Sequence, residues 1–187
     1  MSEAKRELFV HEDDEGMIEL VLPEQRDFIQ QELNELSGFA ETHRTDQGYT
    51  DIYVRKSNPE GLSSLGIKMT DIHQAIADFA PPYDKVITGY GSTYRVEYPD
   101  MQAFGPDEET VLFCEHRGGM LYKAWLIFEF NDPKRYAWSL KLLRKLGEMA
   151  PFLLVDWIME TSVDLQDDPA LQHYLRQYVE EKKTTEP

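Results

Sequence analysis

A cysteine, a histidine and a lysine lie close together in the sequence VLFCEHRGGMLYKAWLIFEF, which spans residues 111–130. Cys114 is the only cysteine of the chain, His116 follows two residues later, and Lys123 lies beyond a Gly-Gly pair. A thiolate that is stabilised by a lysine and served by an imidazole base can act as a nucleophile. These three residues are therefore candidate catalytic residues, and Trp125 would share their surface.

The Gly-Gly pair predicts a β-hairpin with a two-residue turn, which pairs Cys114 with Lys123 across the strands. Strand alternation then predicts a core face and a mixed face, and a shift of register would undo this assignment. The predicted core face holds Val111, Phe113, Met120, Tyr122, Ala124, Leu126, Phe128 and Phe130. The predicted mixed face holds Leu112, Cys114, His116, Leu121, Lys123, Trp125, Ile127 and Glu129.

A structural role competes with the catalytic one for Cys114 and His116. Residues i and i+2 of a strand lie about 6 to 7 Å apart at Cα, so a thiol–imidazole hydrogen bond needs favourable rotamers. The sequence offers no third residue that would orient the imidazole. The sequence therefore favours Cys114 as a small, half-buried apolar residue and His116 as a solvated residue near a turn.

Hydrophobic periodicity predicts the elements that position this hairpin. Strands are expected over 16–22 and 48–56, the latter with Ile52 and Val54 inward, and a further hairpin over 84–98 with a two-residue turn at Gly91-Ser92. Helices are expected from Pro23 to near Gly38, from Thr70 or Asp71 to before Pro81, from Asp132 to Met149, and from Asp168 onward. Residues 57–66 and 99–109 are expected to be loops, whereas 151–159 fits a strand or a buried helix.

These elements predict an α+β fold, because two consecutive hairpins require antiparallel pairing. The sheet should be mostly antiparallel with about six or seven strands, and about four helices should pack mainly on one face. The expected organisation is a flexible acidic arm (1–15), a single α+β domain (16–182) and a disordered tail (183–187). The chain length fits one domain.

The chain is strongly acidic, with 19 Lys and Arg against 35 Asp and Glu, a net charge of −16 and a pI near 4.6. Affinity for nucleic acid comes mainly from basic residues that displace counterions, so direct nucleic-acid binding is not expected, and neither is docking on an anionic membrane. The charge would favour a basic protein partner. The alternative is that the charge serves solubility alone.

Other features favour a cytoplasmic protein without a cofactor. The chain has no apolar run of about 18 residues, its first residues lack the apolar core of a secretory signal, and one cysteine cannot form an internal disulfide. The phosphate-binding loop, the dinucleotide-binding glycine pattern and the G-x-S-x-G elbow are absent. The five histidines have no ligand-like spacing, so no metal site is expected.

Two charged segments are candidate interaction surfaces. The predicted helix 132–149 concentrates cations, of which Lys134, Lys141 and Lys145 would share one face. The segment LVDWIMETSVDLQDD (154–168) instead places carboxylates around a tryptophan that could anchor a basic partner. The alternatives are an ordinary solvated helix face and a core tryptophan with acidic caps. The partner-binding candidates are Trp125, Trp157, Asp156, Glu160, Asp164, Asp167 and Asp168.

The sequence thus supports three functional hypotheses. The first is an acidic interaction module that binds a basic protein, a property shared by inhibitors of the immunity or antitoxin type, by analogy of charge and size. The second is a small enzyme or ligand-binding domain that uses the face formed by Cys114, His116, Lys123 and Trp125. The third is an accessory subunit whose exposed apolar residues contact another protein, which includes a second copy of the chain.

Overall fold

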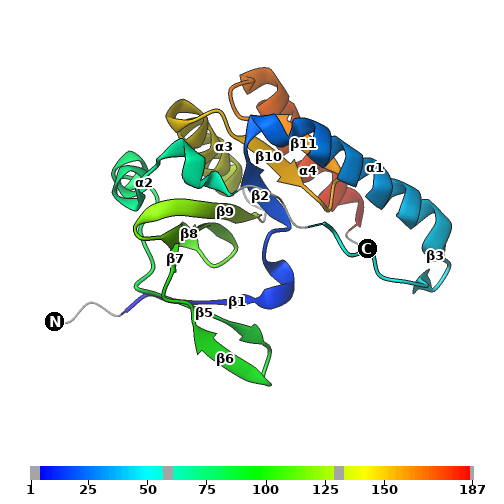
Figure 1. The fold of residues 1–187 in the computed structure, drawn as a ribbon, viewed down its shortest axis with the longest axis horizontal. Helices are drawn as coiled ribbons and strands as arrows, with labels where there is room; N and C mark the ends of the chain where they lie inside the picture. Colours follow the sequence, from blue (N-terminus) through cyan, green and yellow to red (C-terminus); the bar gives the residue numbers. More distant parts are fainter. Residues whose placement is uncertain (1–4, 57–60, 129–132, 186–187) are drawn as a thin grey trace.

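The computed structural model of the chain describes residues 5–56, 61–128 and 133–185, and it has the α+β fold that the sequence predicts (Figure 1). A six-stranded antiparallel sheet has the order β11-β10-β2-β9-β8-β7. Its strands are β2 (Ile18–Val21), β7 (Met101–Asp107), β8 (Thr110–Arg117), β9 (Met120–Phe128), β10 (Leu153–Asp156) and β11 (Thr161–Asp164).

Two smaller sheets complete the strands. The first has the order β1-β5-β6, where β1 (Glu7–His11) pairs in parallel with β5 (Lys85–Tyr90), and β5 pairs with β6 (Tyr94–Glu97) in antiparallel. The second is the two-residue pair β3 (Arg44–Thr45) and β4 (Gly48–Tyr49). In Figure 1 the β5–β6 hairpin projects away from the body of the molecule.

Helices cover both faces of the main sheet, three on one side and one on the other. α2 (Met69–Ile76), α3 (Pro133–Met149) and α4 (Asp168–Thr185) share a core with alternate residues of the sheet. On the opposite face, α1 (Arg26–His43) packs on β2 and β10, and the β1–β5–β6 sheet packs on β7, β8 and β9. Three short 3-10 helices are η1 (Glu12–Asp14), η2 (Pro23–Gln25) and η3 (Leu62–Leu65).

α1 is longer than the sequence predicts. Its apolar stripe buries Ile29 and Leu33, one helical turn apart,. The predicted end near Gly38 is wrong, because the helix continues to His43, whose ring stacks on Phe39. Gly38 is solvent-exposed in the helix, where a glycine costs about 0.5–1 kcal/mol relative to alanine but does not end the helix,.

The predicted strand over 48–56 is wrong beyond Tyr49. Residues 50–56 join no sheet, and the side chains of Ile52 and Val54 are 83% and 81% exposed rather than inward. The side chains still alternate between inward and outward, but Tyr53 and Arg55 are the half-buried residues and the apolar ones face solvent. The apolar pattern does not predict this arrangement, because the buried Glu32 and the half-buried Glu19 hold the side chains of Tyr53 and Arg55 inward, as described below.

The predicted loop over 99–109 is also wrong, because most of it forms β7, an edge strand of the main sheet. Met101, Ala103 and Phe104 are buried. Pro106 lies in β7, and an edge strand tolerates proline because one of its sides needs no ladder hydrogen bonds,. The pairing with β8 shifts between Phe104 and Asp107, which is where the turn-forming residues lie.

Both predicted chain ends contain regular structure. Residues 7–11, predicted to lie in a flexible arm, form β1, and Leu8 and Val10 are buried against the main sheet. α4 continues into the predicted tail, as far as Thr185. A parallel strand contributed by a distant segment gives no local signal, which is why the arm was mistaken for disorder.

Three further elements refine the prediction. The β5–β6 hairpin forms, but Tyr90 pairs with Tyr94, so its loop has three residues rather than two. Within 151–159, Leu153–Asp156 form strand β10. β11 was not predicted, because its four residues follow the turn without a clear period. In the described part of the chain, no helix is both long and apolar enough to span a bilayer.

Candidate functional site

The β8–β9 hairpin has the predicted Gly-Gly turn but a different register. Arg117 pairs with Met120 and His116 with Leu121, as predicted, and then Glu115 pairs with Lys123, which leaves Tyr122 as an unpaired bulge. The bulge lets Leu121 and Ala124 face the same core although they are three positions apart,. The predicted pairing of Cys114 with Lys123 is therefore wrong.

The bulge also re-sorts the two predicted faces, and both of them are core. Leu112 and Cys114 pack with Ala124 and Leu126 beneath α2, α3 and α4. The other face packs beneath the small sheet and holds Val111, Phe113 and Trp125. The predicted mixed face is thus not a solvent-facing surface over these residues.

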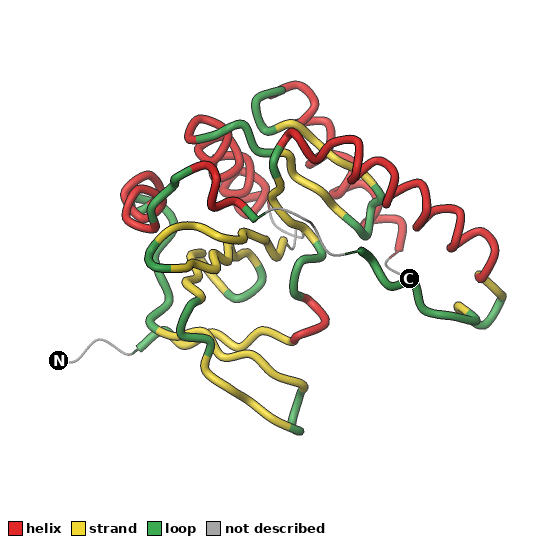
Figure 2. The backbone as a smooth tube through the Cα atoms, viewed as in Figure 1, coloured by secondary structure: helices red, strands yellow, loops and turns green. Residues whose placement is uncertain are grey.

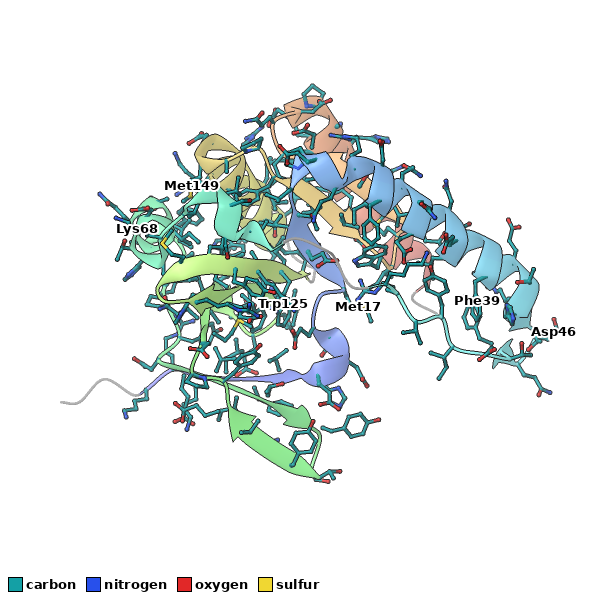
Figure 3. The ribbon with its side chains drawn as sticks, in the orientation of Figure 1. Met17, Phe39, Asp46, Lys68, Trp125 and Met149 are labelled. Carbon is teal, nitrogen blue, oxygen red and sulfur yellow. The ribbon has the colours of Figure 1, made fainter. Side chains whose placement is uncertain are left out.

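Cys114 is fully buried, and burial raises the pKa of its thiol far above the ordinary value,. Lys123 points to the opposite face of the sheet, where it lies 3.9 Å from Glu115. Trp125 lies on β9, where Figure 3 labels it. Its side chain is 3% exposed and stacks on Phe113 with the ring centroids 3.8 Å apart. This arrangement does not activate the thiol and does not present Trp125 to a partner.

Most carboxylates of the acidic segment 154–168 are buried or form ion pairs and hydrogen bonds within the protein. Asp156 is fully buried, and Asp164 lies 3.2 Å from Arg26. Asp167 accepts a hydrogen bond from the Ala170 backbone at the start of α4. Asp168 binds the Arg144 guanidinium through both oxygens. Of the predicted partner-binding residues, Trp157 and Glu160 remain at a groove described below.

Three basic side chains of α3 are paired with carboxylates. Lys141 lies 3.1 Å from Asp78, and Lys145 lies 2.6 Å from Glu148. Arg144 is held by Asp168, as noted above. These pairs neutralise much of the predicted basic helix face.

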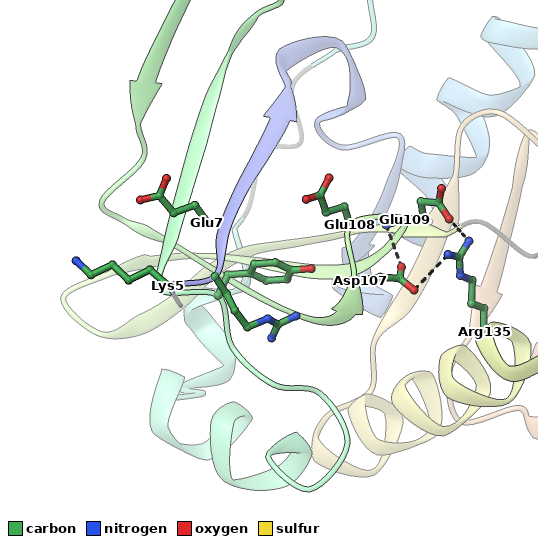
Figure 4. A pocket seen from close by; sticks show the side chains of 8 residues that line it. Lys5, Glu7, Asp107, Glu108, Glu109 and Arg135 are labelled. Carbon is green, nitrogen blue, oxygen red and sulfur yellow. Dashed lines mark hydrogen bonds and ion pairs between the residues drawn. The ribbon is translucent and has the colours of Figure 1, made fainter. Parts of the chain in front are cut away.

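A hollow of about 570 Å³ lies between the first described residues, the β7–β8 turn and α3 (Figure 4). Arg135 closes one side of it through ion pairs with Asp107 and Glu109. Arg6 donates hydrogen bonds to three backbone carbonyls and lies over the ring of Tyr83. Because these cations have partners in the fold, a ligand would have to displace structural contacts.

A second concave site, which we call the groove, lies between α1, the segment that follows β4, and the β10–β11 turn. Its volume of about 420 Å³ is in the range of ligand-binding pockets,. Three lining residues expose large apolar side chains: Tyr49 by 60%, Ile52 by 83% and Ile158 by 65%. The lining residues are Leu36, Phe39, Ala40, Tyr49, Asp51, Ile52, Tyr53, Trp157, Ile158 and Glu160.

Segment 50–56 forms one wall of the groove, and Figure 2 shows it as a loop running back alongside α1. Its inward side chains hold it in place. The Tyr53 hydroxyl and the Lys56 backbone N–H both donate to Glu32 of α1, at 3.3 and 3.0 Å. The Lys56 Nζ lies 2.8 Å from Glu32 and 2.7 Å from Glu35. The segment is therefore fixed without strand pairing.

Glu32 is a buried carboxylate that retains its charge. Desolvation alone would raise its pKa, but the hydrogen bonds and charge of Lys56 outweigh that effect and lower the pKa of Glu32 below its ordinary value,. The ion pair therefore favours the conformation in which segment 50–56 lies against α1.

Trp157 forms the floor of the groove. Its indole N–H donates to Glu19 of β2 at 2.8 Å, and the Arg55 guanidinium lies 4.6 Å from the centre of its ring. Arg55 also donates to the Gly16 carbonyl at 3.1 Å. Burial raises the pKa of Glu19, against the opposing effects of the Trp157 hydrogen bond and the Arg55 charge. These contacts link the turn, segment 50–56 and the sheet.

The β10–β11 turn (157–160) forms the other wall. Asp156 shapes it, because one carboxylate oxygen accepts from the backbone N–H groups of Ile158 and Met159, and the other accepts from the Tyr174 hydroxyl. Glu160 closes the turn with φ = 50°, the left-handed region that glycine and asparagine adopt most readily,. The turn thus holds an isoleucine in solvent and a glutamate in a conformation that costs about 1–2 kcal/mol.

The charges at the groove are of one sign. Asp51 and Glu160 are its charged lining residues, and among the described residues no ion pair neutralises either carboxylate. An apolar groove with two carboxylates at its rim can accept an apolar side chain next to a cation.

Sequence reasoning found two residues of this site, Trp157 and Glu160, and missed Tyr49, Ile52 and Ile158. Ile158 carried no usable sequence signal, because the strand or buried helix expected over 151–159 includes it and β11 was not predicted,. The exposure of Ile52 could not be predicted, since its apolar alternation is that of an ordinary strand.

In the described residues, no group of three or more His, Cys, Asp or Glu side chains is placed to hold a metal ion. Comparison with protein-family models, with curated proteins and with solved structures finds no match to this chain.

Proposed function

We propose that this chain is an acidic protein-interaction module that binds a basic segment of another protein in the groove between α1, segment 50–56 and the β10–β11 turn. The observation that carries the proposal is the combination at this one site of exposed Tyr49, Ile52 and Ile158 with the carboxylates of Asp51 and Glu160. An inhibitor or immunity-type protein would use such a surface to neutralise its target. We also propose a cytoplasmic location, because a single cysteine suits a reducing compartment,.

Apolar contact would supply most of the affinity. Burying apolar surface contributes roughly 25 cal/mol per Å², and the exposed side chains of Ile52 and Ile158 gain nothing from the fold in their present positions. Phe39 would give a partner side chain a rigid aromatic surface, because it is held by the neighbouring rings of His43 and Tyr53,. Trp157 is only 7% exposed, so it supports the groove from below rather than forming its contact surface.

Charge would supply selectivity and speed of association. The chain carries a net charge of −16, so a basic segment is attracted at long range and is then oriented by Asp51 and Glu160. Binding should weaken as salt is added, because exposed charges are screened over about 10 Å at 0.1 M ionic strength. An acidic segment of the same apolar content should be rejected.

A displayed library of random peptides tests the proposal without a known partner. We expect selection on the wild-type protein at low salt to enrich peptides that combine Lys or Arg with β-branched or aromatic residues. These peptides should lose binding to Ile158→Asp and retain it with Val96→Asp. Val96 is a matched control, because it is an exposed apolar residue on the separate β5–β6 hairpin.

Two results would contradict the proposal. The first is enrichment of peptides that bind wild type, Ile158→Asp and Val96→Asp equally well. The second is a failure to enrich any cationic peptide at low salt.

A further inference from the structure

Segment 50–56 has an unpaired backbone. Among the described residues, the N–H groups of Tyr53, Val54 and Arg55 have no hydrogen-bond acceptor. The N–H of Lys56 donates to Glu32, which marks the end of this free stretch. Successive amides of an extended segment point to opposite edges, so the free N–H groups of Tyr53 and Arg55 would share one edge, where another strand can pair.

The side chains of the segment alternate as those of a strand do. Tyr53 and Arg55 point inward to Glu32, Glu19 and Trp157, whereas Ile52 and Val54 point to solvent. Alternation of this kind has the period of two that an extended chain imposes. The inward contacts hold the segment in this form, so a partner that pairs with it spends little entropy on ordering it.

We infer that the partner segment binds in extended conformation and adds as a strand alongside residues 52–55, an inference that rests on the proposed function. Its backbone pairs with the free amides, its apolar side chains cover Ile52 and Val54, and a Lys or Arg side chain reaches Asp51 or Glu160. The expected ligand of the groove is thus a basic extended segment in which apolar and cationic residues alternate.

Two other occupants fit less well. A basic amphipathic helix satisfies its own backbone hydrogen bonds, so it would leave the amides of residues 53–55 unused. A second copy of the chain would bring two acidic surfaces together, since each copy carries a net charge of −16 and presents the same two carboxylates,. Both occupants are distinguishable outcomes of the test below.

The test uses an octapeptide of alternating Lys and Val, capped at both ends, and two N-methylated versions of it. One version is methylated at the valine amides and the other at the lysine amides. Successive amides of a strand point to opposite edges, so strand addition predicts that one version loses affinity about tenfold or more while the other is retained. Wild type, Val54→Asp and the control Val96→Asp are titrated with all three peptides.

Amide hydrogen exchange measured by NMR gives a second readout. We expect the unmethylated peptide to slow exchange at one or more of the amides of residues 53–55, and to leave the Tyr94 and Val96 region of β6 unchanged. A basic helical peptide of equal charge should bind more weakly and protect none of the three amides.

The outcomes separate the binding mode from the proposed function. If the unmethylated peptide binds, with loss in Val54→Asp only, but both methylated versions bind equally, strand addition is overturned and the groove remains a site for basic segments. If the helical peptide binds more tightly than the alternating one, the mode is again overturned. If neither basic peptide binds at millimolar concentration and low salt, both proposals fail. Concentration-dependent dimerisation that is abolished by Val54→Asp would assign the surface to a second copy instead.

Discussion

Two hairpin turns of the main sheet both reverse the chain, but one is formed by glycines and the other by large side chains. The β8–β9 turn uses Gly118 and Gly119 at φ = 58° and 78°, where glycine fits without strain,. The β10–β11 turn uses Trp157, Ile158, Met159 and Glu160, with Glu160 at φ = 50°. The first turn is explained by chain reversal alone, whereas the second retains residues that chain reversal does not require.

The difference separates a structural region from a candidate functional one. Residues that are suboptimal for folding and persist at a concave surface are typical of sites where stability is exchanged for binding. The sequence of the β8–β9 hairpin contains Cys114 and His116 as candidate catalytic residues, yet the side chains of this hairpin mainly fill the core. The β10–β11 turn has no catalytic residue pattern, but it presents Ile158 beside the groove.

The largest expected effect concerns the thiol of the β8–β9 hairpin. Native Cys114 should react with iodoacetamide at pH 8 at least about a hundredfold more slowly than in urea, because labelling requires the core to open. Burial raises the pKa of this thiol, which reduces the reactive thiolate further,. The rate is measured by mass spectrometry. Rapid labelling of the folded protein would show that this hairpin carries a reactive site after all.

Substitution of Asp156 tests whether its hydrogen bonds stabilise the conformation of the β10–β11 turn. Asp156→Ala should lower the free energy of unfolding by about 2–4 kcal/mol, because it removes the acceptor for two backbone amides and for the Tyr174 hydroxyl,. Asp156→Asn should cost much less, since its amide oxygen can still accept from the two backbone amides and its NH2 group can donate to the Tyr174 hydroxyl oxygen,. Urea denaturation measures both values.

The free energy of unfolding should also depend on pH through Asp156. Burial raises the pKa of Asp156, against hydrogen bonds that lower it, so the folded protein takes up a proton more readily than the unfolded chain,. The contribution of Asp156 to stability therefore increases as the pH falls from the raised pKa toward the ordinary value near 3.8. Asp156→Asn should remove this dependence. An unchanged pH profile would contradict this assignment.

The glycine turn should respond more moderately. Gly119→Ala should cost about 1–2 kcal/mol, because an alanine at φ = 78° is in the disfavoured left-handed region,. Gly38→Ala is the matched control in α1, where nothing lies within 4 Å of the added Cβ, and it should gain about 0.5–1 kcal/mol,. Equal effects of the two substitutions would refute the structural account of this turn.

A smaller change in stability is expected at Glu160. Glu160→Gly should raise the free energy of unfolding by about 0.5 kcal/mol, since relief of the left-handed strain exceeds the added entropy of the unfolded chain. The same change should weaken binding of the alternating Lys-Val peptide, because a carboxylate at the groove is lost. If Glu160→Gly were less stable than wild type and bound the peptide normally, Glu160 would serve folding rather than binding, which would contradict the proposed difference between the two turns.

Prediction from sequence succeeded where periodicity and turn chemistry act locally. The α+β class, α2, α3 and the Gly-Gly turn all follow from apolar spacing, proline at the helix start and glycine at the turn. It failed where a distant segment decides the outcome. β1 depends on its parallel partner β5, the Tyr122 bulge depends on which residues the helices bury, and Ile52 is exposed because Glu32 and Glu19 hold its neighbours inward.

The candidate site was harder to predict than the fold. Trp157 and Glu160 were identified as part of an acidic aromatic patch, but Asp156, Asp164, Asp167 and Asp168 have structural roles that only the tertiary arrangement reveals. A run of carboxylates in a sequence does not show which of them are paired. Exposure of Ile158 was also not predicted, because residues 151–159 were expected to form a strand or a buried helix and β11 was not predicted,.

One comparison tests the central claim most directly, namely that the β10–β11 turn presents Ile158 for binding rather than for folding. Affinity for the alternating Lys-Val peptide and the free energy of unfolding are measured for wild type, Ile158→Asp and Val96→Asp. We predict that Ile158→Asp changes stability by less than about 0.5 kcal/mol and weakens binding about tenfold or more, while Val96→Asp changes neither appreciably. Unaltered peptide affinity in Ile158→Asp would contradict the account.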